Sequence, residues 1–181
     1  MNLLLHSCCA PCSAAIIEWL LNNSITPTLF FFNPNIYPFQ EYEIRKNELK
    51  CYAEALNIEF VDGDYNHESW LKKIQGLENQ PERGTRCLEC FKMRLQATAL
   101  LASEKGFTHI ATTLASSRWK SLEQIALAGH QAVTPFPEIT FWEKNWRKDG
   151  LSERRNILLK ENGFYNQLYC GCEFSKRTKV D

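Results

Sequence analysis

The sequence lacks long apolar runs, an excess of one charge sign, internal repeats and ligand-spaced histidine pairs. Its 181 residues carry Lys+Arg 21 against Asp+Glu 21 and only 4 histidines, which disfavours a histone-like polycation and a histidine-rich zinc site. No stretch approaches the roughly 18 apolar residues of a membrane helix, and residues 1–6 lack a basic leader and a cleavage site. With 44% hydrophobic residues, the composition also excludes a disordered chain. We therefore expect one cytoplasmic domain over residues 1–181, with neither a membrane nor DNA as a partner.

Strand-like and helix-like segments alternate along the chain. Short apolar or β-branched runs predict strands at residues 3–6, 28–32, 59–61 and 109–113. Amphipathic or capped segments predict helices at residues 14–21, 41–56, 68–75, 87–105 and 121–128, with Gly129 closing the last one. This order predicts an α/β fold, in which a mainly parallel sheet has helices on both faces and binds ligands at the carboxyl ends of its strands.

Seven of the eight cysteines form three tight groups. The groups are Cys8, Cys9 and Cys12; Cys87 and Cys90; and Cys170 and Cys172. They fall at a strand end, in a loop before a helix and in a loop near the C-terminus, so a doubly wound fold can bring all three to one rim. Cytosolic thiols stay reduced, which leaves metal binding or thiol redox chemistry to explain the groups. Cys51 stands alone in a predicted helix, where we expect a buried small hydrophobic residue.

Three uses of these thiols remain open on spacing alone. Cys9-Ala10-Pro11-Cys12 follows a strand and precedes a helix, as in thioredoxin-like dithiols, but that use leaves the other two groups unexplained. Thiolates are also the ligands of structural zinc and of iron–sulfur clusters. Four cysteines satisfy one zinc ion or one cubane cluster, so seven indicate a second metal centre or a thiol relay.

The motifs of the chain resemble those of the QueH family, the epoxyqueuosine reductases of the non-cobalamin type. The resemblance spans nearly the whole chain, and its motifs are residues 6–13 (HSCCAPCS), 32–36 (FNPNI) with Glu41, Tyr42 and Arg45, 86–91 (RCLECF), Thr112-Thr113-Leu114 with Ser117 and Lys120, Arg147-Lys148, and residues 165–175 (YNQLYCGCEFS). The order of so many motifs makes chance similarity improbable.

The resemblance implies an adenine-nucleotide α-hydrolase-like fold and a cytosolic tRNA-modifying enzyme. Such an enzyme removes the epoxide oxygen of epoxyqueuosine at the tRNA wobble position and gives queuosine, with electrons from a donor that the sequence does not name. The resemblance also implies a 4Fe-4S cluster beside a separate iron ion, with the seven grouped cysteines as ligands. This chain departs from some relatives in having Cys12 in place of Asp and Asn166 in place of Arg.

The remaining candidate residues follow from the chemistry of an RNA substrate. Tyr169 is a candidate proton donor because it lies beside Cys170. The candidate phosphate contacts are Arg118, Lys120, Arg147 and Lys148, and the candidate rim residues after the second strand are Asn33, Asn35, Tyr42 and Arg45. His6 is expected to be a hydrogen-bonded residue at a strand end. The main rival hypothesis is a non-catalytic RNA-binding domain stabilised by zinc.

Overall fold

The computed structural model describes residues 1–176 and has a five-stranded parallel sheet at its centre. The strands are β1 (Leu3–His6), β2 (Thr28–Phe31), β3 (Phe60–Asp62), β4 (His109–Thr112) and β5 (Thr140–Phe141). Their order across the sheet is β3-β2-β1-β4-β5, and every neighbouring pair is parallel. The predicted α/β class is confirmed.

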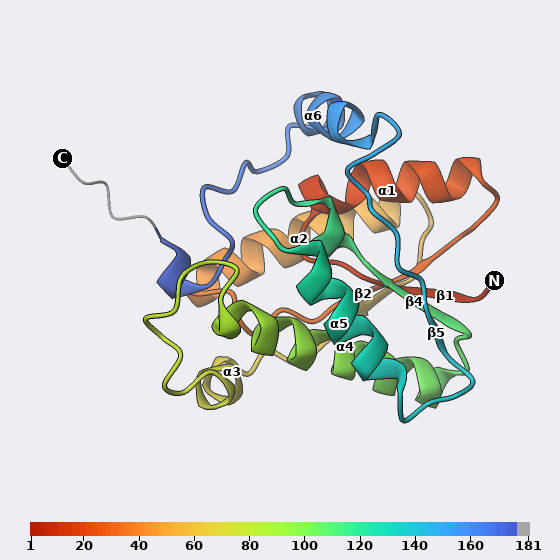
Figure 1. Cartoon of the computed structure of the whole chain (residues 1–181). Helices are drawn as coiled ribbons and strands as arrows, with labels where there is room; N and C mark the ends of the chain where they lie inside the picture. Colours follow the sequence, from red (N-terminus) through yellow and green to blue (C-terminus); the bar gives the residue numbers. More distant parts are fainter. Residues whose placement is uncertain (177–181) are drawn as a thin grey trace.

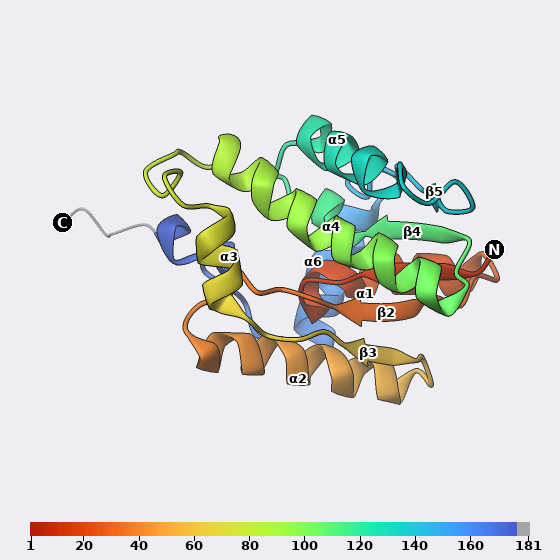
Figure 2. The same cartoon turned by 90° about the horizontal axis from the view of Figure 1, so that it is seen from below.

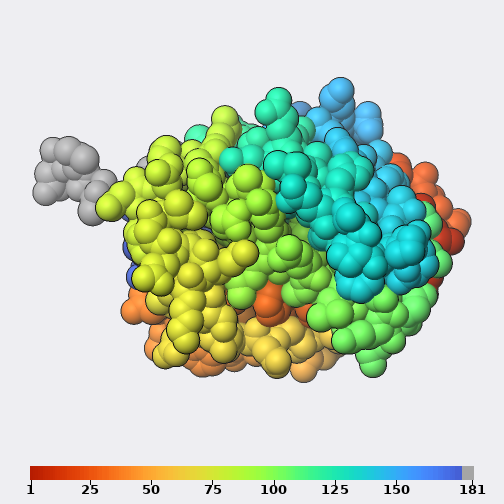
Figure 3. Space-filling view, turned by 60° about the horizontal axis from the view of Figure 1, so that its bottom comes forward, coloured from red at the N-terminus to blue at the C-terminus, as the bar shows by residue number. Residues whose placement is uncertain are grey.

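Six helices within residues 1–176 cover the two faces of this sheet. They are α1 (Ala10–Asn22), α2 (Phe39–Ala55), α3 (His67–Lys73), α4 (Thr85–Lys105), α5 (Leu122–Val133) and α6 (Leu151–Glu161), with short 3-10 turns η1 (Thr113–Ser116) and η2 (Glu173–Ser175). Helices α1, α2 and α6 lie on one face, and α3, α4 and α5 lie on the other (Figures 1 and 2). Figure 3 shows this second face, where the yellow, green and teal atoms of α3, α4 and α5 cover most of the sheet. Within residues 1–176, no helix has the length and apolarity needed to cross a membrane.

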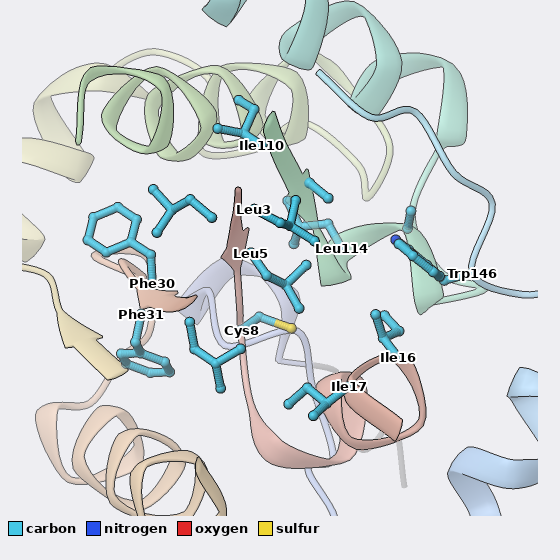
Figure 4. Close-up of a cluster of buried hydrophobic side chains, with 14 of the residues drawn as sticks. Leu3, Leu5, Cys8, Ile16, Ile17, Phe30, Phe31, Ile110, Leu114 and Trp146 are labelled. Atoms are coloured by element: carbon cyan, nitrogen blue, oxygen red, sulfur yellow. The ribbon is translucent and has the colours of Figure 1, made fainter. Parts of the chain in front are cut away.

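The apolar strands β1, β2 and β4 form the centre of the core. All four residues of β1 are buried, since β1 has β2 and β4 on its two sides and helices above and below. Figure 4 shows Leu3 and Leu5 of β1 packed with Ile110 and Leu114, and shows Cys8 in the same cluster. The chain builds β2 and β3 on one side of β1 and then returns to build β4 and β5 on the other. This reversal makes the carboxyl ends of β1 and β4 the expected place for a ligand.

Two sequence predictions on α5 and α1 need correction. Helix α5 does not end at Gly129 but continues to Val133. The glycine does not mark a helix end; it stands inside the helix because a Cβ atom there would overlap the ring of Phe141. Helix α1 begins at Ala10, four residues before the predicted start. Pro11 suits the first turn of a helix, where its missing N–H costs nothing, and Cys12 therefore lies in the first turn of α1.

Cys51 is exposed, so the expectation of a buried residue is wrong. The buried face of α2 includes Leu49 and Ala53, each two residues from Cys51. A separation of two residues turns the side chain about 200° around a helix, which directs Cys51 to the solvent side.

Candidate metal centre

The first group of thiols lies where β1 passes into α1. Strand β1 ends at His6, and Cys9 is the N-cap of α1. The sulfur atoms of Cys8, Cys9 and Cys12 lie within 4.8 Å of one another, and Cys8 Sγ is 3.8 Å from Cys9 Sγ. Cys8 and Cys9 are buried, and Cys12 is partly buried. Soft thiolates in this geometry suit a thiophilic metal ion, and the helix N-terminus adds a favourable positive potential.

The three thiols of this triad differ in their affinity for protons. Hydrogen bonds from Cys12 and Cys9 lower the pKa of Cys8 well below its usual value. Lys120 and Arg94 act on the Cys8 pKa in the same direction. Burial raises the pKa of Cys9, and the hydrogen bond with Cys8 raises the pKa of Cys12. The metal-free triad therefore favours a thiolate at Cys8 and two thiols whose protons a metal ion must displace.

The second group lies in the first two turns of α4. Cys87 and Cys90 are three residues apart, which places both thiols on the same side of the helix. Burial raises the pKa of both thiols, and at Cys90 the guanidinium of Arg94 opposes this shift. Arg94 follows Cys90 by four residues on the same side of α4 and is only 2% exposed. A buried positive charge therefore accompanies this pair of sulfur atoms.

The third group lies in a segment without helix or strand, between Glu161 at the end of α6 and η2. Cys172 is buried, and burial raises the pKa of its thiol to about 12. Besides burial, the charge of Cys170 raises the pKa of both Cys87 and Cys90, so the second and third groups are neighbours. In Figure 1 this blue segment passes beside the start of α2 and the loop before α4.

The three groups share one cavity of about 260 Å³. Six grouped cysteines line it: Cys8, Cys12, Cys87, Cys90, Cys170 and Cys172. The seventh, Cys9, belongs to the triad with Cys8 and Cys12. Because Cys8 follows β1 and the lining residues Leu114 and Ser117 follow β4, the cavity lies at the switch point of the sheet.

Some polar atoms in the cavity lining lack a hydrogen-bond partner, and they indicate whether the cavity fits a metal–thiolate centre. Asn35 Oδ1, Trp70 Nε1 and Gln167 Nε2 are buried without a hydrogen-bond partner among the described residues. The Trp70 indole acts to lower the pKa of Cys90, which places its N–H near that sulfur. A thiolate bound to metal is an acceptor for such a donor. The soft donor set and this unpartnered N–H therefore both fit a thiophilic metal centre.

The lining is strongly cationic. Its charged residues are Arg45, Arg83, Arg86, Arg94, Arg155 and Lys120, against one carboxylate, Glu82, in the described part of the chain. Burial alone would lower the pKa of Lys120, but the charges of Cys170, Cys8 and Cys12 raise it above its usual value. The cavity is thus suited to a group of net negative charge.

A buried network of hydrogen bonds lies next to the cavity, at the carboxyl ends of the central strands. His6 Nδ1 lies 2.8 Å from Thr112 Oγ1, Arg94 Nε donates to His6 Nε2 over 3.4 Å, and another N–H of Arg94 donates to Asn33 Oδ1. Asn33 Nδ2 donates to the carbonyl of Ser7 at 3.0 Å. Burial, with a further contribution from Arg94, lowers the pKa of His6 to about 3. The network joins the ends of β1, β2 and β4 to α4, and His6 is a hydrogen-bonded strand-end residue as predicted.

The remaining predicted site residues divide into two sets. Asn35, Arg45, Lys120 and Tyr169 line the cavity. The residues outside its lining are Asn33, Tyr42, Arg118, Arg147 and Lys148. Asn166, which stands where some relatives have Arg, is exposed and also lies outside the lining.

Besides Asn33, which belongs to the buried network, Tyr42 and Arg147 of the second set have clear structural contacts. The hydroxyl of Tyr42 donates to the Gly63 carbonyl at 3.2 Å, and its ring is buried. Arg147 Nη2 donates to the carbonyls of Ser117 and Lys120 at 2.5 and 2.7 Å, so Arg147 holds the loop that carries Lys120.

Several lining residues are absent from the set predicted from the sequence, among them Arg94 and Trp70. Arg94 has a local signal, because its spacing of four and seven residues from Cys90 and Cys87 places it on their side of a helix. Trp70 has none, since it reaches the cavity from the separate helix α3, and only the tertiary packing of α3 on α4 brings it there.

The chain is an α/β protein with a thiol-lined cavity at the switch point of its parallel sheet. Its cysteine triad, of which two members are buried and one is partly buried, is suited to a metal ion. A family model described as epoxyqueuosine reductase QueH matches residues 3–178. The epoxyqueuosine reductase QueH of Acinetobacter baylyi is 48% identical over 97% of this chain and 81% of its own length. Those of Haemophilus influenzae and Thermotoga maritima are 45% and 33% identical, over 97% and 96% of this chain and 72% and 90% of their own lengths. The chain belongs to the QueH family of epoxyqueuosine reductases, which are oxidoreductases of tRNA modification.

Proposed function

We propose that this protein converts epoxyqueuosine at the tRNA wobble position to queuosine, with the seven grouped cysteines holding a 4Fe-4S cluster and an adjacent iron ion. The observation that carries the proposal is the meeting of six of these cysteines in one cavity, with the seventh in a triad beside it. One cluster or one zinc ion takes four thiolates, so seven fit two metal sites better than one.

The reaction removes oxygen from an epoxide and leaves an alkene. It consumes two electrons and two protons, and the oxygen leaves as water. When bound, the cluster supplies single electrons and the separate iron supplies a Lewis acid for the oxygen. The protein chain holds the metal ligands, orients the substrate and provides or admits protons.

Tyr169 is our candidate for the proton donor. It lines the cavity, and burial raises the pKa of its phenol to about 12, so the group is protonated at neutral pH. Its hydroxyl donates to the Tyr37 carbonyl at 2.5 Å and must leave that acceptor to serve the substrate. Water is the alternative donor, and replacing Tyr169 by Phe separates the two.

The cationic rim supports an RNA substrate. Lys120 and Asn35 line the cavity, while Arg118 and Lys148 are exposed outside it, where phosphates are accessible. The modified base enters a cavity only when it is unstacked, as in the loops that specific RNA-binding proteins recognise. We assign Asn35 to the modified base and the exposed cations to the phosphate backbone.

The decisive experiment combines metal analysis with a direct assay. Protein reconstituted anaerobically with iron and sulfide is incubated with epoxyqueuosine-containing tRNA and a reductant, and the nucleosides are identified by mass spectrometry. The proposal predicts queuosine formation that depends on iron and on the reductant. Stoichiometric zinc with tRNA binding and no turnover, in protein prepared anaerobically, would instead favour a zinc-stabilised RNA-binding domain.

A further inference from the structure

The segment that carries Cys170 and Cys172 has no regular secondary structure of its own before η2. The other two groups are positioned by helix N-termini, at α1 and α4. Cys170 and Cys172 therefore depend on side chains from elsewhere for their position. One residue of α2, Arg45, makes several of these contacts.

Arg45 donates hydrogen bonds to two successive backbone carbonyls, those of Tyr169 and Cys170. Its Nη2 donates to the Tyr169 carbonyl at 3.2 Å, and its Nη1 donates to the Cys170 carbonyl at 3.1 Å. The guanidinium also lies 5.3 Å from the centre of the Tyr169 ring. Two donors in a rigid planar fork fix both the position and the direction of this stretch of backbone.

Glu41 holds the guanidinium in that orientation. Glu41 Oε1 accepts hydrogen bonds from Arg45 Nε at 2.8 Å and from Arg45 Nη2 at 2.6 Å, and the two residues are one helical turn apart in α2. The other carboxylate oxygen of Glu41 accepts from the Tyr165 hydroxyl at 2.9 Å. Arg45 is 2% and Glu41 is 8% exposed, so water competes little for these bonds. The pair thus connects α2 to the segment at Tyr165 as well as at Cys170.

Gly171, the residue between the two cysteines, leaves room for the Arg45 guanidinium. Gly171 has φ +116°, which only glycine adopts without strain, and a Cβ atom there would lie 3.1 Å from Arg45 Nη1 and 2.9 Å from Ile36 Cγ1. Its carbonyl accepts from the Tyr37 N–H at 2.9 Å. The backbone at Gly171 therefore fits closely between Arg45 and the loop that follows β2.

We propose that Arg45 is a positioning residue that fixes Cys170 and Cys172 in the metal centre from helix α2. The inference rests on the proposed function in one respect, because Cys170 and Cys172 are taken to be metal ligands. The contacts by which Arg45 positions them are all between atoms of the protein chain. This role gives Arg45, which lines the cavity beside the sulfur atoms, a task other than contact with tRNA. Its hydrogen bonds to Glu41, Tyr169 and Cys170 engage all three guanidinium nitrogens.

Thiol reactivity in the full-length, reduced, metal-free protein tests the proposal without iron or tRNA. Timed alkylation followed by peptide mass spectrometry gives a separate rate for each cysteine. In Arg45→Gln we expect the rates at Cys170 and Cys172 to rise by about tenfold or more, because two charged hydrogen bonds to that backbone are lost. Rates at Cys90 and at the exposed Cys51 are expected to change less than about twofold.

Arg45→Lys serves as the conservative variant. Lysine keeps the charge beside Glu41 but cannot span two carbonyls, so we expect an intermediate rate at Cys172. Arg154→Gln is the matched control, because Arg154 forms a two-bond pair with Glu18 at 2.7–2.8 Å and neither residue lines the cavity. Its alkylation pattern should equal that of the unmodified protein.

Iron and sulfide content after reconstitution, with the absorption spectrum, provides the second measurement. The proposal predicts that Arg45→Gln loses metal in parallel with the faster alkylation of Cys172, and that Arg154→Gln does not. Unchanged rates at Cys170 and Cys172, or an equal increase at Cys90, would overturn the positioning role. Failure of the protein to reduce epoxyqueuosine would overturn the proposed function while leaving the alkylation result standing, so the two failures are distinguishable.

Discussion

Gly129 lies inside α5, where the absence of a side chain leaves room for the ring of Phe141. A Cβ atom at this position would lie 2.3 Å from both Cε1 and Cζ of Phe141, whereas non-bonded carbon atoms prefer separations of about 3.5–4.0 Å. The substitution Gly129→Ala therefore sets two effects against each other. Alanine improves helix propensity by about 1 kcal/mol, and overpacking a core contact costs about 1–3 kcal/mol.

We expect the steric cost to exceed the gain in helix propensity. The overlap involves the ring atoms Cδ1, Cε1 and Cζ, and Phe141 is 6% exposed and in edge contact with His130, so the ring cannot move away freely. Taking the upper half of the overpacking range gives a net loss of about 1–2 kcal/mol in the free energy of unfolding. For a chain of this length, Tm falls by about 2–8 °C. Urea unfolding of the reduced, metal-free protein, followed by circular dichroism, measures the free energy.

The Phe141→Leu background isolates the cause. Without the aromatic ring the added methyl group has space, so Gly129→Ala should be neutral or should stabilise by up to about 1 kcal/mol there. If alanine stabilised the unmodified protein by that amount, the ring would not occupy the space in question, and our account of why α5 contains a glycine would be refuted.

Three further predictions concern the cavity and its rim. Tyr169→Phe should lower turnover by about 10²–10⁴-fold, the usual contribution of a general acid, and full turnover in a steady-state assay would assign the proton to water. Hydrogen bonds from Cys12 and Cys9 keep the pKa of Cys8 low and Lys120 adds to this effect, so Lys120→Gln should raise that pKa and reduce the thiolate absorbance at neutral pH; an unaltered titration of metal-free protein would contradict the electrostatic role. Lys148→Ala should reduce the slope of log affinity for tRNA against log salt by about 0.7–0.9, and an identical slope would remove this residue from the interface.

Much of the fold could be predicted because its signals are local. The short apolar strands have no alternation, which is typical of a parallel sheet buried on both faces, and β1 is buried throughout. The spacing of Cys87 and Cys90 is itself enough to place both thiols on one side of a helix. Local signals fail where a distant contact determines the outcome, as at Gly129, whose role depends on a ring that is brought to it by β5.

The site is less predictable than the fold because its parts meet only in three dimensions. Asn33 and Arg147 have the residue types of RNA contacts, but Asn33 is bonded to Arg94 and Ser7, and Arg147 is bonded to two carbonyls of a loop. The sequence identifies a polar or charged side chain but does not identify its hydrogen-bond partner. The assignment of such a residue to substrate or to structure therefore requires its hydrogen bonds.

The cations of the cavity differ in burial, and this difference separates two tasks. Arg86 and Arg94 are buried and held to the protein, Arg86 by the carbonyls of Glu78 and Gln80 at 2.6 Å each and Arg94 by its network with His6. Fixed charges in a region of low dielectric interact strongly with nearby thiolates and are little affected by salt. Arg83 also donates to two carbonyls, those of Trp119 at 3.1 Å and Arg118 at 2.7 Å, but it lies in the exposed part of the lining. Solvent and salt screen its charge there, which suits contact with a mobile polyanion. Salt should therefore weaken tRNA binding while leaving the pKa values of the buried thiols nearly unchanged. The exposed cations act on tRNA through solvent, where salt screens them, whereas the buried cations act on the thiolates through the protein interior.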